Sequence, residues 1–177
     1  MGVEKHNTSA PLRLALAAVF GALAAAVTVA FVLPIPATAG YFNLGDAIIY
    51  IAALVFGPYV GAFAGGSVAI SDILVGAGQF APGTLVVKGL EGAIVGFLSR
   101  RLQKSTMNPG ISASLTVVLG GLEMVLGYFV YEQLFLGYNQ TTALAEMPFN
   151  LFQMIIGLIV AVPITYAVQR VFPQLKS

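Results

Sequence analysis

The sequence predicts an all-α integral membrane protein, a single bundle of six transmembrane helices with both termini in the cytoplasm. Of its 177 residues, 58% are hydrophobic and only 8% are charged, whereas soluble domains carry about 25% charged residues. The mean hydropathy is +0.92, and the 20 Gly and 9 Pro residues are typical of helices packed in lipid. We therefore expect a multi-pass protein of the cell membrane.

The expected domain covers residues 1–177, with a polar tail at 1–11, the bundle at 12–170 and a C-terminal tail at 171–177. Hydropathy alone predicts four helices, at 12–33, 85–99, 112–135 and 148–168. The first is long enough to cross a hydrocarbon core of about 30 Å at about 1.5 Å per residue. Thr84 is expected to cap the second of these helices, and Pro148 to lie in the first turn of the last.

The stretch 46–75 is either one long kinked helix or two short helices broken at Gly57-Pro58. The distribution of basic residues favours two helices. With two, the basic groups that flank the spans all fall on one side of the membrane, as the positive-inside rule expects. These groups are Arg13, Arg100, Arg101, Lys104, Arg170 and Lys176. Six spans follow.

Small residues recur at a spacing of four, which lets helices approach each other closely in lipid. They form three stripes: Ala18, Ala22 and Ala26; Gly57, Gly61 and Gly65; and Gly92 and Gly96. Internal packing explains such stripes without further function. The alanine stripe of the first helix has the alternative of docking another membrane protein.

Several function classes are disfavoured by composition. The chain has no Cys, and its one histidine, His6, lies in the polar tail, so disulfides, thiolate catalysis, a Cys- or His-ligated metal site and a Ser-His triad are not expected. The net charge of +1 with scattered basic residues argues against a nucleic-acid surface. We expect no cofactor and no enzymatic activity.

Polar residues that are costly in lipid gather in the half of the bundle away from the basic flanks. Lys88 and Glu91 are three residues apart, as are Asn150 and Gln153, so each pair presents two groups to one side of its helix. Asp72 lies at a similar depth on a third helix. An intrahelical ion pair is the alternative for Lys88 and Glu91, and a turn cap is the alternative for Asp72. Convergence from three helices favours a binding site.

Other polar and aromatic residues are expected at about the same depth in the membrane. Tyr128 and Glu132 lie near the end of one predicted helix, with Glu132 close enough to the surface to be solvated, whereas Glu123 lies near the midplane. Two Gly- and Pro-rich loops, 34–45 and 76–83, carry Tyr41, Phe42, Asn43, Gln79 and Phe80. These loops suit lids over a flat ligand, although their aromatic residues could equally anchor the protein at the interface. The excess of carboxylates over Lys88 suggests a cationic or donor-rich ligand.

Three segments carry a resemblance to a known family: GYFNLGDAIIYIAALVFGPYVGAFAGG, the following KGLEG and the late PFNLFQ. Together they resemble the substrate-binding S components of energy-coupling factor (ECF) vitamin transporters, of the riboflavin or hydroxymethylpyrimidine type. The resemblance extends over residues 12–170.

This resemblance implies a small vitamin-binding subunit with an outward-facing pocket, which joins a membrane coupling protein and two cytoplasmic ATPases. The chain itself has no G-x-x-x-x-G-K-[ST] phosphate loop. The resemblance makes Ala18, Ala22 and Ala26 the candidate docking stripe. The candidate substrate-binding residues are Asn43, Asp72, Gln79, Lys88, Glu91, Tyr128, Asn150 and Gln153. The chain has no Trp, so stacking on an aromatic ligand would fall to Phe or Tyr.

Two other functions compete with this interpretation. A self-sufficient channel or ion-coupled carrier would use Asp72, Glu91 and Glu123 as an ion relay, but the half with the basic flanks lacks polar groups to complete a path. An intramembrane enzyme would use Glu91 and Glu123 as acid and base, and it is the weakest of the three.

Overall fold

The computed structural model describes residues 10–36, 38–103 and 106–175. Its helices are α1 (Ala10–Ala30), α2 (Gly45–Phe56), α3 (Pro58–Ser67), α4 (Ala69–Leu74), α5 (Ala81–Leu102), α6 (Pro109–Leu134) and α7 (Gln140–Val171). A two-stranded hairpin, β1 (Leu33–Pro34) and β2 (Tyr41–Phe42), follows α1, and a 3-10 turn, η1 (Pro173–Leu175), follows α7. His6, Lys104 and Lys176 lie outside the described residues.

The predicted all-α membrane fold is confirmed. Helices α3 and α4 follow each other with one intervening residue and act as one segment, so the chain makes six helical segments. Helices α1, α5, α6 and α7 are each long and apolar enough to cross a membrane. The chain does break at Gly57-Pro58, because Gly57 adopts a φ of 88° and Pro58 starts α3 without an N–H to donate.

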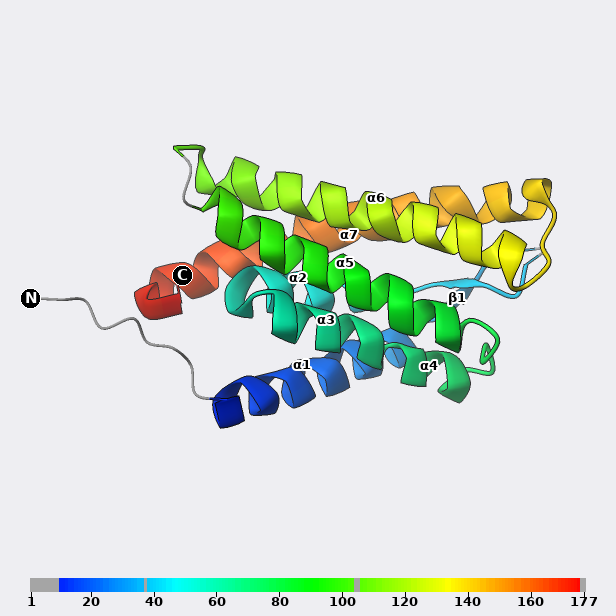
Figure 1. Ribbon diagram of the computed structural model, residues 1–177, viewed down its shortest axis with the longest axis horizontal. Helices are drawn as coiled ribbons and strands as arrows, with labels where there is room; N and C mark the ends of the chain where they lie inside the picture. The colour runs from blue at the N-terminus through cyan, green and yellow to red at the C-terminus, as the bar shows by residue number, and fades with distance from the viewer. Residues whose placement is uncertain (1–9, 37, 104–105, 176–177) are drawn as a thin grey trace, which may run out of the picture.

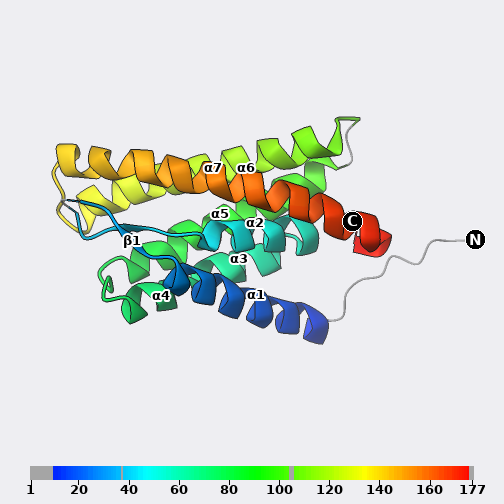
Figure 2. The ribbon, with the colours of Figure 1, turned by 180° about the vertical axis from the view of Figure 1, so that it is seen from behind.

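The helices form an elongated bundle in which α1 lies along one edge and α6 with α7 along the other (Figure 1). Helices α2, α3 and α5 lie between these edges, and the view from behind agrees (Figure 2). The start of α1 and the end of α7 lie at the same end of the bundle, and the hairpin lies at the opposite end. Which end faces the cytoplasm stays a prediction.

Glycines bring α3 and α5 into backbone contact, as the spacing of the small residues predicts. A Cβ at Gly61 would lie 2.5 Å from the carbonyl oxygen of Gly92, and a Cβ at Gly65 would overlap the backbone of Lys88. Gly96 meets the backbone of Gly57 in the same way. This contact places α5 at the centre of the bundle.

Three boundaries differ from the sequence-based expectation. Helix α1 ends at Ala30, before the hairpin. Helix α5 begins at Ala81, so Thr84 lies inside it and is not its cap. Helix α7 begins at Gln140, because the side chain of Asn139 accepts a hydrogen bond from the Thr142 N–H at 2.9 Å. Pro148 is consequently inside α7 and not in its first turn, which neighbouring helices allow in a membrane bundle.

Candidate ligand-binding site

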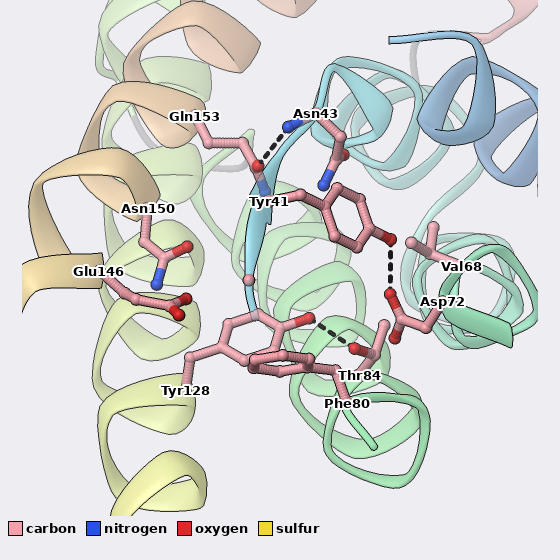
Figure 3. A pocket seen from close by; sticks show the side chains of 11 residues that line it. Tyr41, Asn43, Val68, Asp72, Phe80, Thr84, Tyr128, Glu146, Asn150 and Gln153 are labelled. Atoms are coloured by element: carbon pink, nitrogen blue, oxygen red, sulfur yellow. Dashed lines mark hydrogen bonds between the residues drawn. The ribbon is translucent and has the colours of Figure 1, made fainter. Parts of the chain in front are cut away.

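A cavity lies at the hairpin end of the bundle, among four helices and the strand β2 (Figure 3). Its interior is about 30 Å³, and the wider space that includes the open mouth is about 380 Å³. The lining residues are Gly40, Tyr41, Asn43, Val68, Asp72, Phe80, Thr84, Tyr128, Glu146, Asn150 and Gln153. Four helices and the strand β2, with residues next to them, therefore line a single small cavity.

The hairpin covers one side of the cavity and is held down by hydrogen bonds to distant segments. The Tyr41 hydroxyl donates to Asp72 Oδ1 at 2.5 Å, and the Ala39 N–H donates to the Tyr138 hydroxyl at 3.3 Å. Burial, together with the neighbouring Asp72 carboxyl, raises the pKa of Tyr41 above its usual range. The hydroxyl therefore stays protonated at neutral pH and remains a donor to Asp72.

Helix α7 presents one polar face to the cavity. Glu146, Asn150 and Gln153 follow each other at spacings of four and three residues, which places them on one side of a helix, and all three line the cavity (Figure 3). Gln153 is fixed at both ends of its amide. Its Oε1 accepts from the Asn43 N–H at 3.0 Å, and its Nε2 donates to Asp46 Oδ2 at 2.9 Å.

Aromatic and hydroxyl groups form the opposite part of the wall. Phe80 and Tyr128 lie in the lower part of the close-up, with their rings next to each other (Figure 3). The Tyr128 hydroxyl is 2.8 Å from Thr84 Oγ1. Both aromatic residues belong to a buried apolar cluster with Met124 and Met154, so their positions are set by packing. The cavity therefore offers a firm apolar surface to a flat ring.

A group of buried charges lies behind the cavity wall. Lys88 is 1% exposed; its Nζ bonds to Asp46 Oδ1 and lies 3.5 Å from Glu91 Oε2. The Tyr50 hydroxyl donates to Glu91 Oε1 at 2.6 Å. Asp46 links this group to the cavity through Gln153. One cation is thus shared by two carboxyl groups that have no access to solvent.

The structure brings five of the eight predicted substrate-binding residues to the cavity lining: Asn43, Asp72, Tyr128, Asn150 and Gln153. Lys88 and Glu91 lie behind the wall in the buried group, and Gln79 is exposed in the α4–α5 loop, where its carbonyl accepts from the Tyr131 hydroxyl at 2.8 Å. Contact of any of the eight with a ligand stays a prediction.

Sequence reasoning missed Glu146, because the expected start of the last helix at Pro148 left this residue in a loop. It also misplaced Glu132, which is 1% exposed and not solvated. The two carboxyl groups interact with each other across α6 and α7. The available signal was the helix cap at Asn139. A helix that starts there includes Glu146, and the spacing of four residues then places Glu146 on the same face as Asn150.

The cavity lining is acidic. Asp72 and Glu146 line it, and the lining residues include no Lys, Arg or His among the part of the chain that the structure describes. Asp72 Oδ2 and Glu146 Oε1 are buried and have no hydrogen-bond partner within those described residues. The Thr84 hydroxyl lies close to Asp72, and Thr38 and the Gly40 backbone lie close to Glu146, so donors of the protein reach both carboxyl groups.

The predicted docking stripe lies away from this cavity. Ala18, Ala22 and Ala26 are exposed on α1, whereas Ala17, Gly21 and Ala24 are its buried residues that pack against the bundle. Gly21, for example, meets the side chains of Ser67 and Phe63. The stripe is therefore not used for packing among the residues that the structure describes, and its docking role stays a prediction.

Comparison with known proteins gives concordant matches. Residues 9–170 match the family model described as ECF-type riboflavin transporter, S component. An uncharacterized protein of Pyrococcus woesei is 42% identical over 149 residues, which cover 82% of this chain and 95% of that protein. The thiamine precursor transporter HmpT of Lactococcus lactis subsp. cremoris (strain MG1363) is 29% identical over 160 residues, covering 89% of this chain and 88% of HmpT.

Proposed function

Because the chain belongs to the family of ECF-type riboflavin transporter S components, it is a membrane-embedded, substrate-specific subunit for a vitamin or vitamin precursor, and we propose that the cavity under the hairpin is its binding pocket. The observation that carries this proposal is the convergence of four helices and the strand β2 on one polar and aromatic cavity. Pockets of this kind, apolar with a few convergent polar groups, are typical of small-ligand sites.

The hairpin acts as the lid of this pocket. It consists of two strands of two residues each and is tied to the bundle by hydrogen bonds from Tyr41 to Asp72, from Ala39 to Tyr138 and, directly after β2, from the Asn43 N–H to Gln153. Breaking a few such bonds, each worth about 0.5–1.5 kcal/mol, opens the cavity without disturbing the helices. Ligand entry therefore occurs at the hairpin end of the bundle.

The orientation in the membrane follows from charge. Arg13, Arg100, Arg101 and Arg170 lie near the end of the bundle that holds both described chain ends. Cytoplasmic ends of membrane proteins carry the excess of Lys and Arg. The described chain ends are therefore cytoplasmic, and the pocket opens outward.

S components work with a coupling protein and ATPases, and the partner surface on this chain is the exposed stripe of Ala18, Ala22 and Ala26. Small residues at a spacing of four form a flat ridge that another helix can approach closely. The stripe is exposed and belongs to α1, the helix that lies along one edge of the bundle (Figure 1). The chain contributes ligand capture, and ATP hydrolysis takes place on the partners.

The test has two stages. Mass spectrometry of small molecules released from gently purified protein should find a stoichiometric vitamin-like compound. Uptake of that compound into liposomes should then require the coupling protein, the ATPases and ATP. Uptake of the compound by the chain alone, driven by a proton or sodium gradient, would instead establish the carrier that the sequence left open.

A further inference from the structure

Two glutamate side chains meet at the hairpin end of the bundle. Glu132 lies in the last turn of α6 and is 1% exposed, and Glu146 lies near the start of α7 and is 4% exposed. Their carboxyl groups lie within hydrogen-bonding reach of each other. Apart from Glu146, no described residue offers a hydrogen-bond partner to either carboxyl oxygen of Glu132. The two helices thus bring two buried carboxyl groups together.

The turn of the hairpin packs on this carboxyl pair. The Thr38 hydroxyl and the Gly40 N–H lie close to the Glu146 carboxyl group, and a Cβ at Gly40 would overlap that group. Gly40 and Glu146 also line the cavity together (Figure 3). Glu146 therefore holds the lid at its turn, one residue before the point where Tyr41 bonds to Asp72.

No cation balances the pair within the described residues. The ionisable groups on the elements around it are Asp72 of α4, Tyr41 of β2, Tyr128 of α6, Tyr138 of the α6–α7 loop and Lys88 of α5. Among these five groups only Lys88 is a cation, and it is engaged by Asp46 and Glu91. A proton is therefore the positive charge that can be placed between the two carboxyl groups.

One proton satisfies the whole arrangement. Glu132, which has no other partner, can donate an O–H to Glu146, and the ionised Glu146 then accepts from Glu132, Thr38 and Gly40 together. Loss of the proton leaves two like charges buried side by side, which is strongly unfavourable. Two ionised carboxyl groups need water, and the hairpin turn is the segment packed on Glu146 that can move without unwinding a helix.

On this basis, and resting on the proposed function, we propose that Glu132 and Glu146 form a proton-dependent latch for the lid. The pair holds the hairpin closed while it shares one proton and releases the hairpin when that proton is lost. Since the closed lid binds one proton more than the open lid, closure is favoured at low pH and is lost as the pH rises. A bound ligand is therefore retained in acid surroundings and released more readily in alkaline ones.

The position of the lid is measured on the ligand-free full chain in nanodiscs. Because the chain has no Cys, Ala39→Cys in the hairpin and Leu119→Cys on α6 provide unique sites for two spin labels, and both residues are exposed. Double electron–electron resonance gives the distances between the labels from about pH 5, above the ordinary glutamic acid pKa of about 4.3, to about pH 9. The ratio of closed to open lid should fall at least about tenfold over this range, since one linked proton changes the ratio by up to about tenfold per pH unit.

Glu132→Gln is the decisive variant. Its amide keeps the shape of the carboxyl group and donates an N–H to Glu146 at every pH, so the lid should stay closed and the pH dependence should disappear. Glu146→Gln also removes the like charge, and it serves alone if thermal unfolding shows that Glu132→Gln does not fold. Glu123→Gln is the matched control, because Glu123 is a partly buried carboxyl residue of α6 that does not line the cavity; it should keep the pH dependence of the original chain.

Asp72→Asn separates the pair from the other carboxyl group that holds the lid. The asparagine oxygen can still accept from Tyr41, so the pH dependence should persist in this variant. The inference is overturned if the pH dependence disappears in Asp72→Asn or survives in Glu132→Gln and Glu146→Gln. A lid whose position in the original chain does not change with pH overturns it as well.

The latch and the proposed function fail differently, because the lid measurement uses no ligand. A lid that ignores pH, in a chain that releases a vitamin-like compound on purification, would refute the latch and leave the vitamin-binding subunit intact. A chain that releases no such compound and supports no ATP-driven uptake with its partners would refute the proposed function itself.

Discussion

Gln153 connects the cavity to the buried charges: its Nε2 donates to Asp46 Oδ2 at 2.9 Å, and Asp46 in turn holds Lys88. The other end of the same amide accepts from the Asn43 N–H at 3.0 Å. One side chain therefore joins the lid segment, the cavity wall and the charged group. Disturbing it should affect both stability and binding.

Replacing Gln153 by Leu keeps the volume but leaves the Asn43 N–H and Asp46 Oδ2 unpaired. Each unpaired buried group costs about 1–3 kcal/mol, so the free energy of unfolding should fall by about 2–6 kcal/mol and ligand affinity should fall with it. SDS titration in mixed micelles measures the first and calorimetry the second. Gln133→Leu is the control, because among the described residues the Gln133 amide bonds to the Phe129 carbonyl of its own helix and to no other helix. Equal losses in the two variants would contradict the linking role.

Lys88 should be required for stability more than for ligand contact. Lys88→Met leaves Asp46 and Glu91 buried without their cation, and breaking a buried ion pair in this way costs about 3–5 kcal/mol. The double variant Lys88→Met with Asp46→Asn should recover part of that loss, because it restores the balance of charge. Unfolding measurements on the single and double variants form a double-mutant cycle. If Lys88→Met instead kept full stability and lost ligand binding, Lys88 would be a direct ligand contact.

The glycine contact between α3 and α5 gives a third prediction. In Gly65→Ala the new Cβ would overlap the Lys88 backbone, so the helices must separate and the free energy of unfolding should fall by about 1–3 kcal/mol, as for an overpacked core. Gly89→Ala, on the partner helix, has its nearest neighbour at 3.6 Å. It should be neutral or stabilise by up to about 1 kcal/mol, since Ala favours helix over Gly. Unfolding of both variants under the same conditions checks the difference.

Much of this architecture is predictable from the sequence, because hydropathy and the Gly-Pro break act within one segment. The four long helices follow from hydropathy and the glycine ridges from local spacing, whereas the break at Gly57, and with it the count of six segments, follows from the distribution of basic residues. Asp46 as the partner of Lys88 does not, because the two residues come from different helices and periodicity relates only residues of one helix. The residues next to Asp46 in the sequence give no indication that it pairs with Lys88.

In the candidate site, too, some residues could be predicted from local spacing and others could not. Asn150 and Gln153 were placed by their spacing, and both line the cavity. Glu146 was missed because Pro148 is a stronger start signal than Asn139 when a helix is considered alone. Inside the bundle the missing N–H of Pro148 is tolerated, so α7 begins eight residues earlier than expected. A single wrong boundary thus removed one of the two acidic groups of the cavity.

Substitutions in the alanine stripe of α1 should affect ATP-driven transport without affecting ligand binding. Ala18→Leu with Ala22→Leu adds bulk to an exposed ridge and should prevent close approach of a partner helix. Ligand affinity of the isolated chain should stay within about twofold, a difference well below 1 kcal/mol, whereas ATP-driven uptake by the reconstituted complex should fall at least about tenfold, the effect of about 1.4 kcal/mol.

Leu119→Phe is the control for added volume on a membrane-facing surface, because Leu119 is exposed on α6, at the opposite edge of the bundle (Figure 2). Co-purification with the coupling protein should follow uptake in each variant. Uptake that persists in the Leu variants while co-purification is unchanged would mean that the coupling protein contacts another face, and the apolar groove beside α3 and α4, lined by Tyr59, Phe63 and Ile70, would be the next surface to substitute.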